Sequence, residues 1–126
     1  MTSVIHSQAA DIPYNMTSTT FDIPGFQIVG TLGVVRGVVV RSRSVFGTIG
    51  ASFQTLVGGN ISIFTELAER TRQQAFDTML IQADMAGADA VIGIRYDATE
   101  MPQGATEVLC YGTAVRVKPL DEPTSR

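Results

Sequence analysis

The fold is decided by residues 60–96, NISIFTELAERTRQQAFDTMLIQADMAGADAVIGIRY. This stretch has no proline, has no glycine before Gly87, and is rich in the helix formers Ala, Leu, Glu, Gln and Met. Asn60 or Ser62 can cap the start of a helix with a side-chain oxygen, and Gly87 stands where a left-handed C-terminal residue belongs. The pattern predicts one long helix, a glycine stop and a strand.

The predicted helix carries one narrow polar stripe, which at 100° per residue contains Glu66, Arg70, Gln73, Asp77 and Asp84. The rest of its surface is largely apolar, and this arc is wider than a helix resting on a single sheet needs. We therefore expect a second surface to cover the helix, and in a chain this short another copy of the protein is the simplest source. The residues expected at this subunit interface are Ile63, Leu67, Phe76, Leu80, Ile81 and Met85.

The strand after Gly87 is apolar on both faces. Residues 90–94 read AVIGI, whereas a strand with one wet face would alternate apolar and polar side chains. Gly93 in its middle predicts a bulge or a close approach of another backbone. Both faces of this strand are therefore expected to be covered.

A first long strand is predicted over residues 26–43, FQIVGTLGVVRGVVVRSR, which are dense in β-branched side chains. Its three glycines, Gly30, Gly33 and Gly37, are expected to bend or bulge it. Residues 44–59 are interrupted by glycines but are too apolar for a free loop, so we expect a short helical turn over 51–57.

The last part of the chain predicts a hairpin. Residues 97–104, DATEMPQG, read as its polar loop, and residues 106–118 as a final strand that is again apolar on both faces. A right-handed crossover makes the first strand parallel to the strand at 90–94, and the final strand fits antiparallel between them. The fold class is therefore α+β: a small, curved, mostly antiparallel sheet with one long helix across it and an apolar far face.

Composition excludes several classes of protein. A chain of 126 residues, 44% hydrophobic and 17% charged, is typical of a single globular domain. A net charge of −3 and a pI near 4.9 argue against general nucleic-acid binding. No apolar run approaches the roughly 20 residues of a membrane span, and the first residues do not resemble a secretory signal. The single cysteine excludes an internal disulfide, and we expect a cytoplasmic protein.

Several segments together resemble the YbjQ-like family of small bacterial proteins: VVRGVVV (34–40), the doublet Gly58-Gly59, TRQQAFDTM (71–79), AGADAVIGI (86–94) and GTAV (112–115). That family is mostly uncharacterised and is described as a "putative heavy-metal-binding" domain. The resemblance implies a dodecin-like βαββ subunit that assembles into a pentameric ring. Leu32 stands where some members carry a cysteine, so the resemblance does not extend to that metal ligand.

The resemblance also divides the chain. Residues 1–18, rich in Ser, Thr and Asn, are expected to form a flexible N-terminal extension, although Tyr14 could dock onto a neighbour. Residues 19–118 form the YbjQ-like domain, and residues 119–126 a C-terminal tail.

Metal binding is not favoured by the residues present. A soft divalent ion takes several Cys or His ligands, and the chain offers one of each, His6 and Cys110. Symmetry around a ring could multiply Cys110, which is a weak candidate, but a single cysteine inside a strand is more often a small buried apolar residue. We expect no specific heavy-metal site and no cofactor.

Catalysis is not favoured either. His6 is the only histidine and is poorly placed as a base for a nucleophile, and the spacing of the carboxylates pairs no two of them for acid–base work. Asp89 is expected to cap a turn. The glycine doublet before the helix could bind an anion, but no lysine follows it, so a turn with a cap is the simpler interpretation. Arg41 and Arg43 are expected at a solvated strand end or in an ion pair between subunits.

Two functions remain open. The first is a non-catalytic ring protein whose surface serves self-assembly into a homo-oligomer, expected to be a pentamer. The alternative is a binding protein that holds a small ligand or a metal ion between subunits. Native mass spectrometry would separate the two, because it reports the subunit count and any bound mass together.

Overall fold

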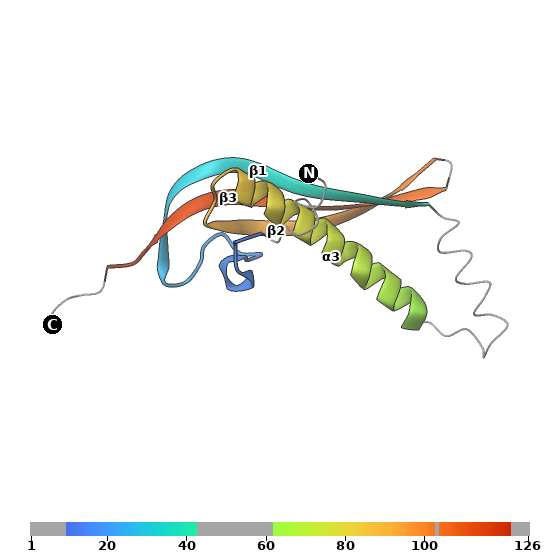
Figure 1. Cartoon of the computed structure of the whole chain (residues 1–126), viewed down its shortest axis with the longest axis horizontal. Helices are drawn as coiled ribbons and strands as arrows, with labels where there is room; N and C mark the ends of the chain where they lie inside the picture. Colours follow the sequence, from blue (N-terminus) through green and yellow to red (C-terminus); the bar gives the residue numbers. More distant parts are fainter. Residues whose placement is uncertain (1–9, 43–61, 103, 122–126) are drawn as a thin grey trace.

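The computed structural model describes residues 10–42, 62–102 and 104–121, and these form one sheet crossed by one helix (Figure 1). In chain order the elements are the short 3-10 helix η1 (Tyr14–Met16), strand β1 (Phe26–Ser42), helix α3 (Ser62–Met85), strand β2 (Ala90–Met101) and strand β3 (Ala105–Pro119). The strand order is β1-β3-β2, with β3 antiparallel to both neighbours, so β1 and β2 run parallel. The predicted α+β class and strand arrangement are confirmed. In the described part, no helix is long and apolar enough to cross a membrane.

Helix α3 ends where the glycine stop was predicted. The Ala88 N–H donates to the carbonyl oxygen of Ala83 (3.1 Å) and the Gly87 N–H to that of Asp84 (3.0 Å), while Gly87 has a φ of 88°. This is the Schellman arrangement, which supplies partners for carbonyl groups of the last turn. At the other end, the candidate cap Asn60, the doublet Gly58-Gly59 and the turn predicted over 51–57 lie outside the described residues.

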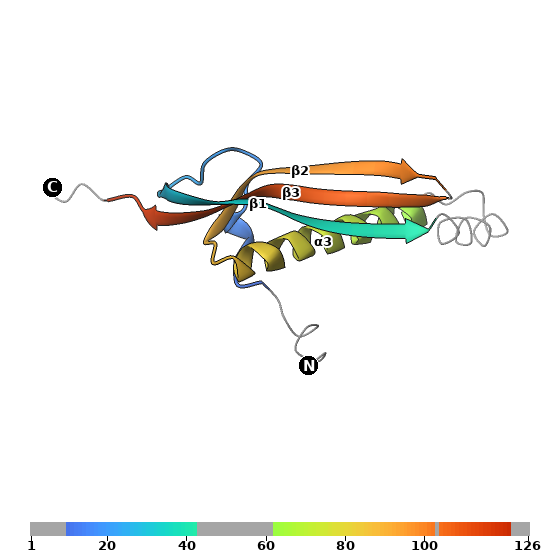
Figure 2. The ribbon, with the colours of Figure 1, turned by 90° about the horizontal axis from the view of Figure 1, so that it is seen from above.

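The helix packs on the sheet through small residues. Ala75, Met79 and Ala83 are fully buried on the side of α3 that faces the sheet. A side chain at Gly37 in β1 would meet the carbonyl oxygen of Ala75 and would lie 2.6 Å from the Met79 nitrogen. Gly37 therefore allows the two backbones to approach, whereas the sequence suggested a bend or bulge at this position. Figure 2 shows α3 below the sheet, with β3 between the other two strands (Figure 2).

The bulges lie at the other two glycines of β1 and at Gly93. The register between β1 and β3 shifts between Ile28 and Gly30 and between Thr31 and Gly33. In β2 it shifts between Ile92 and Arg95, around Gly93 with a φ of 64°. Since a bulge changes which side chains face the core, Val91 and Ile94 both face the helix although they are three residues apart. The bulge predicted at Gly93 is confirmed.

Residues 90–94 of β2 are covered on both faces by their own chain. One face lies under α3; on the other, Ala90 and Ile92 pack with Val115 and with Ile23 from the segment before β1. The first residues of β1 complete this second, smaller core. The predicted cover on both faces is confirmed for residues 90–94, and on the side away from the helix the same chain supplies it through Met16, Ile23, Phe26 and Ile28.

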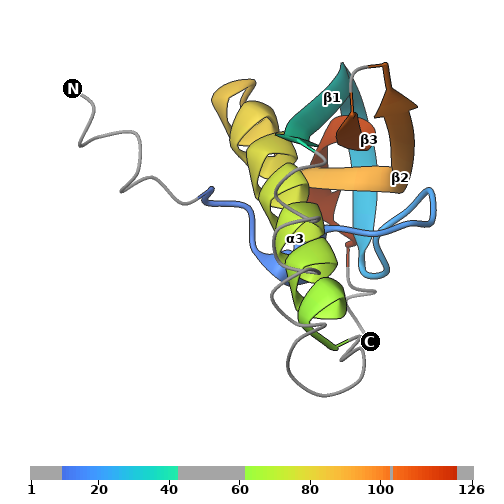
Figure 3. The same ribbon diagram turned by 90° about the vertical axis from the view of Figure 1, so that its right-hand side faces the viewer.

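The segment before β1 belongs to the packed domain. Ile12 is 6% exposed and lies in the main core, and the ring of Tyr14 is 6.0 Å from that of Phe76. The Ser18 N–H donates to the Val91 carbonyl oxygen (3.0 Å), and the Ile94 N–H donates back to Ser18 (3.1 Å), along the outer edge of β2. Residues 10–18 therefore differ from the flexible extension that was expected, because they contribute an apolar anchor and backbone pairing. Figure 3 shows this segment passing from the helix side to the β2 edge (Figure 3).

The hairpin between β2 and β3 is longer than predicted. Residues 97–101 were expected in a polar loop, but they continue β2, pairing from Asp97 opposite Leu109 to Met101 opposite Ala105. The reversal occurs around residues 102–104, with Gly104 at a φ of 78°. Backbone pairing with β3 extends the strand through residues whose side chains are polar and exposed.

Candidate functional site

A cavity of about 360 Å³ separates the first half of α3 from the β2–β3 hairpin. It forms because the helix diverges from the hairpin toward its N-terminus, as Figure 1 shows. We call it the wedge cavity, and its lining consists of Ala68, Thr71, Arg72, Tyr96, Asp97, Ala98, Thr106 and Val108.

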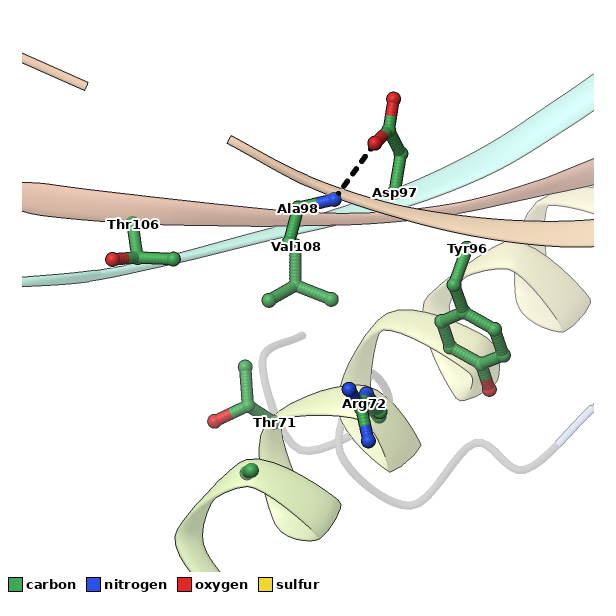
Figure 4. A pocket seen from close by; sticks show the side chains of 8 residues that line it. Thr71, Arg72, Tyr96, Asp97, Ala98, Thr106 and Val108 are labelled. Atoms are coloured by element: carbon green, nitrogen blue, oxygen red, sulfur yellow. Dashed lines mark hydrogen bonds between the residues drawn. The ribbon is translucent and has the colours of Figure 1, made fainter. Parts of the chain in front are cut away.

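The interior of the wedge cavity is largely apolar. On the sheet side, Ala98 and Val108 are direct partners across β2 and β3, and Tyr96 projects on the same face as Ala98. Figure 4 shows Val108 and Tyr96 pointing toward the helix, while the carboxylate of Asp97 points away (Figure 4). That carboxylate accepts a hydrogen bond from the Ala98 N–H (3.0 Å), so it lies outside the apolar space.

The polar groups of the cavity include two hydrogen-bond donors, Arg72 and Tyr96. Partial burial, and then the nearby Cys110, raise the pKa of the Tyr96 hydroxyl to about 12, so it is protonated near neutral pH. The positive charge of Arg72 acts in the opposite direction and lowers the pKa of the same phenol, but its effect is smaller. The Arg72 guanidinium lies 3.7 Å from a carboxylate oxygen of Glu69 in an exposed pair. The Thr71 hydroxyl donates to the Leu67 carbonyl oxygen (2.9 Å), so toward the cavity it can only accept.

Cys110 lies in the main core beside a second sulfur. Its thiol is fully buried in the central strand and lies 3.8 Å from the sulfur of Met79. Burial raises the pKa of the Cys110 thiol, and since a metal binds the thiolate, this environment weakens it as a ligand. Sequence reasoning did not find the Met79 contact, because the pairing of helix and strand is set by tertiary packing.

The residues present do not fit a heavy-metal site. His6 lies outside the described residues, and within residues 10–42, 62–102 and 104–121 no three His, Cys, Asp or Glu side chains gather as a metal site would require. A thioether and a protonated thiol inside a packed core do not form the set of about four ligands that a closed soft-metal site uses.

The interface residues expected on α3 do not share one surface. Phe76 and Leu80 lie in the subunit's own core, where they pack with residues of the sheet and the N-terminal segment. Leu67 and Ile81 are half-buried, and Met85 is 83% exposed. The side chain of Ile63 lies outside the description. Among the expected interface residues whose side chains are described, Leu67, Ile81 and Met85 offer apolar surface to a neighbour.

The far face of the sheet carries a larger apolar surface. Val34, Val38 and Val40 are 67%, 42% and 51% exposed, and they alternate with Val35 and Val39, which face the helix. Across the sheet, Leu109 pairs with Val38 and Tyr111 with Arg36. We call Val34, Val38, Val40, Leu109 and Tyr111 the far-face patch. The sequence predicted an apolar far face, and this patch shows where the chain leaves it uncovered.

The charged residues singled out in the sequence lie apart from one another. The Asp89 carboxylate accepts a hydrogen bond from the Val117 N–H (3.0 Å), so it binds strand β3 rather than capping a local turn as expected. The Asp89 carboxylate reaches this partner because the start of β2 lies beside the end of β3. The Arg41 guanidinium donates to the side-chain oxygen of Gln74, and Arg43 lies outside the described residues.

Comparison with known proteins identifies the family. A family model described as "Putative heavy-metal-binding", YbjQ_1, matches residues 15–118. The chain belongs to the YbjQ-like family. A UPF0145 protein of Paraburkholderia phymatum is 61% identical over 107 residues, which are 85% of this chain and 96% of the relative. A UPF0145 protein of Solibacter usitatus is 56% identical over 111 residues, 88% of this chain and 99% of the relative.

One solved structure is also similar to this YbjQ-like chain. It is the crystal structure of a protein of unknown function from Pediococcus pentosaceus, with 20% sequence identity and a TM-score of 0.42. The match covers 81% of this chain and 96% of that one.

Proposed function

We propose that this YbjQ-like protein is a non-catalytic, self-assembling protein that forms a homo-oligomeric ring in the cytoplasm. The observation that carries the proposal is the far-face patch, in which β-branched and aromatic side chains stand open on a long, regular sheet. Full burial of one such side chain is worth roughly 1.5–3 kcal/mol, so covering several of them provides a substantial driving force for association. The resemblance to the YbjQ-like family sets the expected number of subunits at five.

The non-catalytic part of the proposal is supported by the surroundings of the side chains that could act as nucleophiles. The Cys110 thiol is buried against Met79 and its pKa is raised, which disfavours the nucleophilic thiolate. The Thr71 hydroxyl, at the wall of the wedge cavity, donates its proton to a backbone carbonyl. A reproducible turnover abolished by changing a single Asp, Ser or Cys would overturn this part.

The self-assembly proposal is tested by placing a charge in the far-face patch. Val38→Glu puts a carboxylate opposite Leu109, where contact with another subunit would strand it away from water. We expect native mass spectrometry and sedimentation velocity to report an oligomer for the parent and a folded monomer for the variant. Gln27→Glu is the matched control, since it adds the same charge to an exposed position of β1 opposite Lys118. A parent that is monomeric at micromolar concentration, or a Val38→Glu variant that still assembles, contradicts the proposal.

Binding of a small ligand or metal ion between subunits is the second candidate. The geometry favours a cavity within one subunit, since the walls of the wedge cavity come from one helix and one hairpin of the same chain. This observation is developed below.

A further inference from the structure

We propose that the wedge cavity binds a small carboxylate with a compact apolar body, such as an aryl or branched-chain acid. The apolar part would lie between α3 and the hairpin, against Ala68, Ala98 and Val108, and the carboxylate would meet Arg72 and Tyr96. This goes beyond self-assembly, because every wall of the cavity belongs to one subunit. The proposal therefore holds or fails independently of the oligomeric state.

The size of the cavity limits the ligand. Its volume of about 360 Å³ is at the lower end of the roughly 300–1,000 Å³ of small-molecule sites. Ala68 lines it from the helix and Ala98 from the sheet, and their short side chains leave the space open. A single ring or a short branched chain fits this space.

The charges around the cavity select an anion. Arg72 and Tyr96 are both hydrogen-bond donors, and a guanidinium binds a carboxylate through two parallel N–H groups. The nearest lining carboxylate, Asp97, points away and is held by the Ala98 N–H. A cationic ligand would be repelled by the guanidinium of Arg72, and Glu69, which pairs with Arg72, does not line the cavity. The apolar floor favours an organic acid over inorganic phosphate, which has no apolar part to bury.

The resting partner of Arg72 is exchangeable. Its contact with Glu69 spans 3.7 Å, and the two side chains are 55% and 70% exposed. Exposed pairs of this kind contribute only about 0–1 kcal/mol. A ligand carboxylate bound in the partly enclosed cavity can therefore replace Glu69 at little cost, and the guanidinium already stands at the site.

The test is a titration of the full-length protein with benzoate, followed by amide chemical shifts. We expect shifts that saturate and that centre on Ala68, Tyr96, Ala98 and Val108. Benzamide, which has the same shape without the charge, should bind at least about tenfold more weakly, a difference of about 1.4 kcal/mol. Inorganic phosphate should not produce these shifts.

Three variants locate the site. Arg72→Gln is expected to weaken benzoate binding by about tenfold or more, because a charge-assisted contact is lost. Arg70→Gln is the matched control, since Arg70 is exposed on the same helix but does not line the cavity, and it should leave the affinity unchanged. Ala98→Leu should fill the cavity and abolish binding, while amide shifts far from the site show that the fold is kept.

Several outcomes would overturn the proposal. These are the absence of saturable benzoate binding up to millimolar concentration, equal affinity of the Arg72→Gln and Arg70→Gln variants, and equal affinity for benzoate and benzamide. Shifts at Ala98 and Val108 that depend on protein concentration and not on benzoate would identify a second copy of the chain as the occupant instead.

Discussion

Gly37 marks the closest approach between β1 and α3. A Cβ at this position would stand 2.6 Å from the Met79 nitrogen and 2.9 Å from the Cβ of Thr78, distances that require the backbones to move apart. This single position therefore sets the spacing between helix and sheet. Its role is distinct from that of the bulge glycines of β1, Gly30 and Gly33, where an added Cβ meets open space.

The first prediction concerns this position. We expect Gly37→Ala to destabilise the protein by about 3 kcal/mol, at the upper end of the overpacking range of roughly 1–3 kcal/mol, because the obstacle is helix backbone rather than a side-chain tip. Gly30→Ala, on the same strand and with no atom within 4 Å of the new Cβ, is the control and should change stability by less than about 1 kcal/mol. Urea unfolding measures both. Equal effects of the two substitutions would contradict the packing role of Gly37.

Tyr96 supplies a prediction about pH. Partial burial raises the pKa of its hydroxyl from 10.0 to about 12, so the folded protein holds this proton more tightly than the unfolded chain does. The contribution to stability is therefore complete below pH 10 and is lost as the pH rises from 10 to about 12. In a spectrophotometric titration, the difference between the parent and Tyr96→Phe should be a single ionisation near pH 12. A difference centred at pH 10 would refute the raised pKa.

At the scale of the element, α3 serves two surfaces with neighbouring residues. Leu80 is buried at 6% exposure against the core, while Ile81, next in the chain, is half-buried on the flank of the helix. The 100° step between them places one side chain in the core and the next on the flank, where the proposed assembly would have it meet a neighbour.

The prediction for the helix is that the same charge has different effects at these two positions. Leu80→Glu should destabilise the subunit by roughly 3–5 kcal/mol, because an unpaired carboxylate would be forced into the core. Ile81→Glu should cost about 1 kcal/mol of subunit stability and impair assembly. Circular dichroism during thermal unfolding and sedimentation velocity on both variants separate the effects. An Ile81→Glu variant that assembles like the parent would remove α3 from the interface and leave the far-face patch as the contact.

The N-terminal segment is packed in the structure although its hydrophobic pattern does not predict this. Residues 10–20 have no sustained apolar period, yet Ile12 lies in the main core and Thr20 accepts a hydrogen bond from the Gly93 N–H (2.8 Å). Strand β2 lies at the edge of the sheet, so backbone groups on its outer side lack a strand partner, and the segment pairs with them. The segment therefore serves to pair with the outer edge of β2.

At the scale of the whole molecule, the family description and the chemistry of this chain lead to different expectations. The description names heavy metals, whereas the two sulfur atoms that meet here are a buried thiol and a thioether within the core. Reaching them would require opening the contact between α3 and β3.

The prediction is that the protein has no tight, specific heavy-metal site. Calorimetric titration with zinc and cadmium should show no submicromolar binding, and the Cys110→Ser variant should behave as the parent does. Any weak binding by exposed carboxylates should be equal in the two proteins, since serine leaves those groups unchanged. Submicromolar binding that disappears in Cys110→Ser would contradict this and would support the family's description.

Local patterns in the sequence predict helix α3, the three strands and their order. The helix and its stop at Gly87, the strand at 90–94 with its bulge, the central place of β3 and the apolar far face all follow from local patterns: helical or alternating periodicity, glycine positions, and crossover topology. These are properties of short stretches or of chain connectivity. The family resemblance, carried by the same stretches, was confirmed over residues 15–118.

Tertiary packing determines which apolar surfaces remain exposed to solvent. The width of the apolar arc on α3 suggested another subunit, but part of it is covered by Ile12 and Tyr14 of the same chain. The wedge cavity likewise arises from the angle between the helix and the hairpin, which brings Arg72 of α3 and Tyr96 of β2 to the same cavity. Burial depends on contacts between residues that are distant in the chain. Hydrophobic periodicity shows that a side chain should be buried, but it does not show which part of the protein buries it.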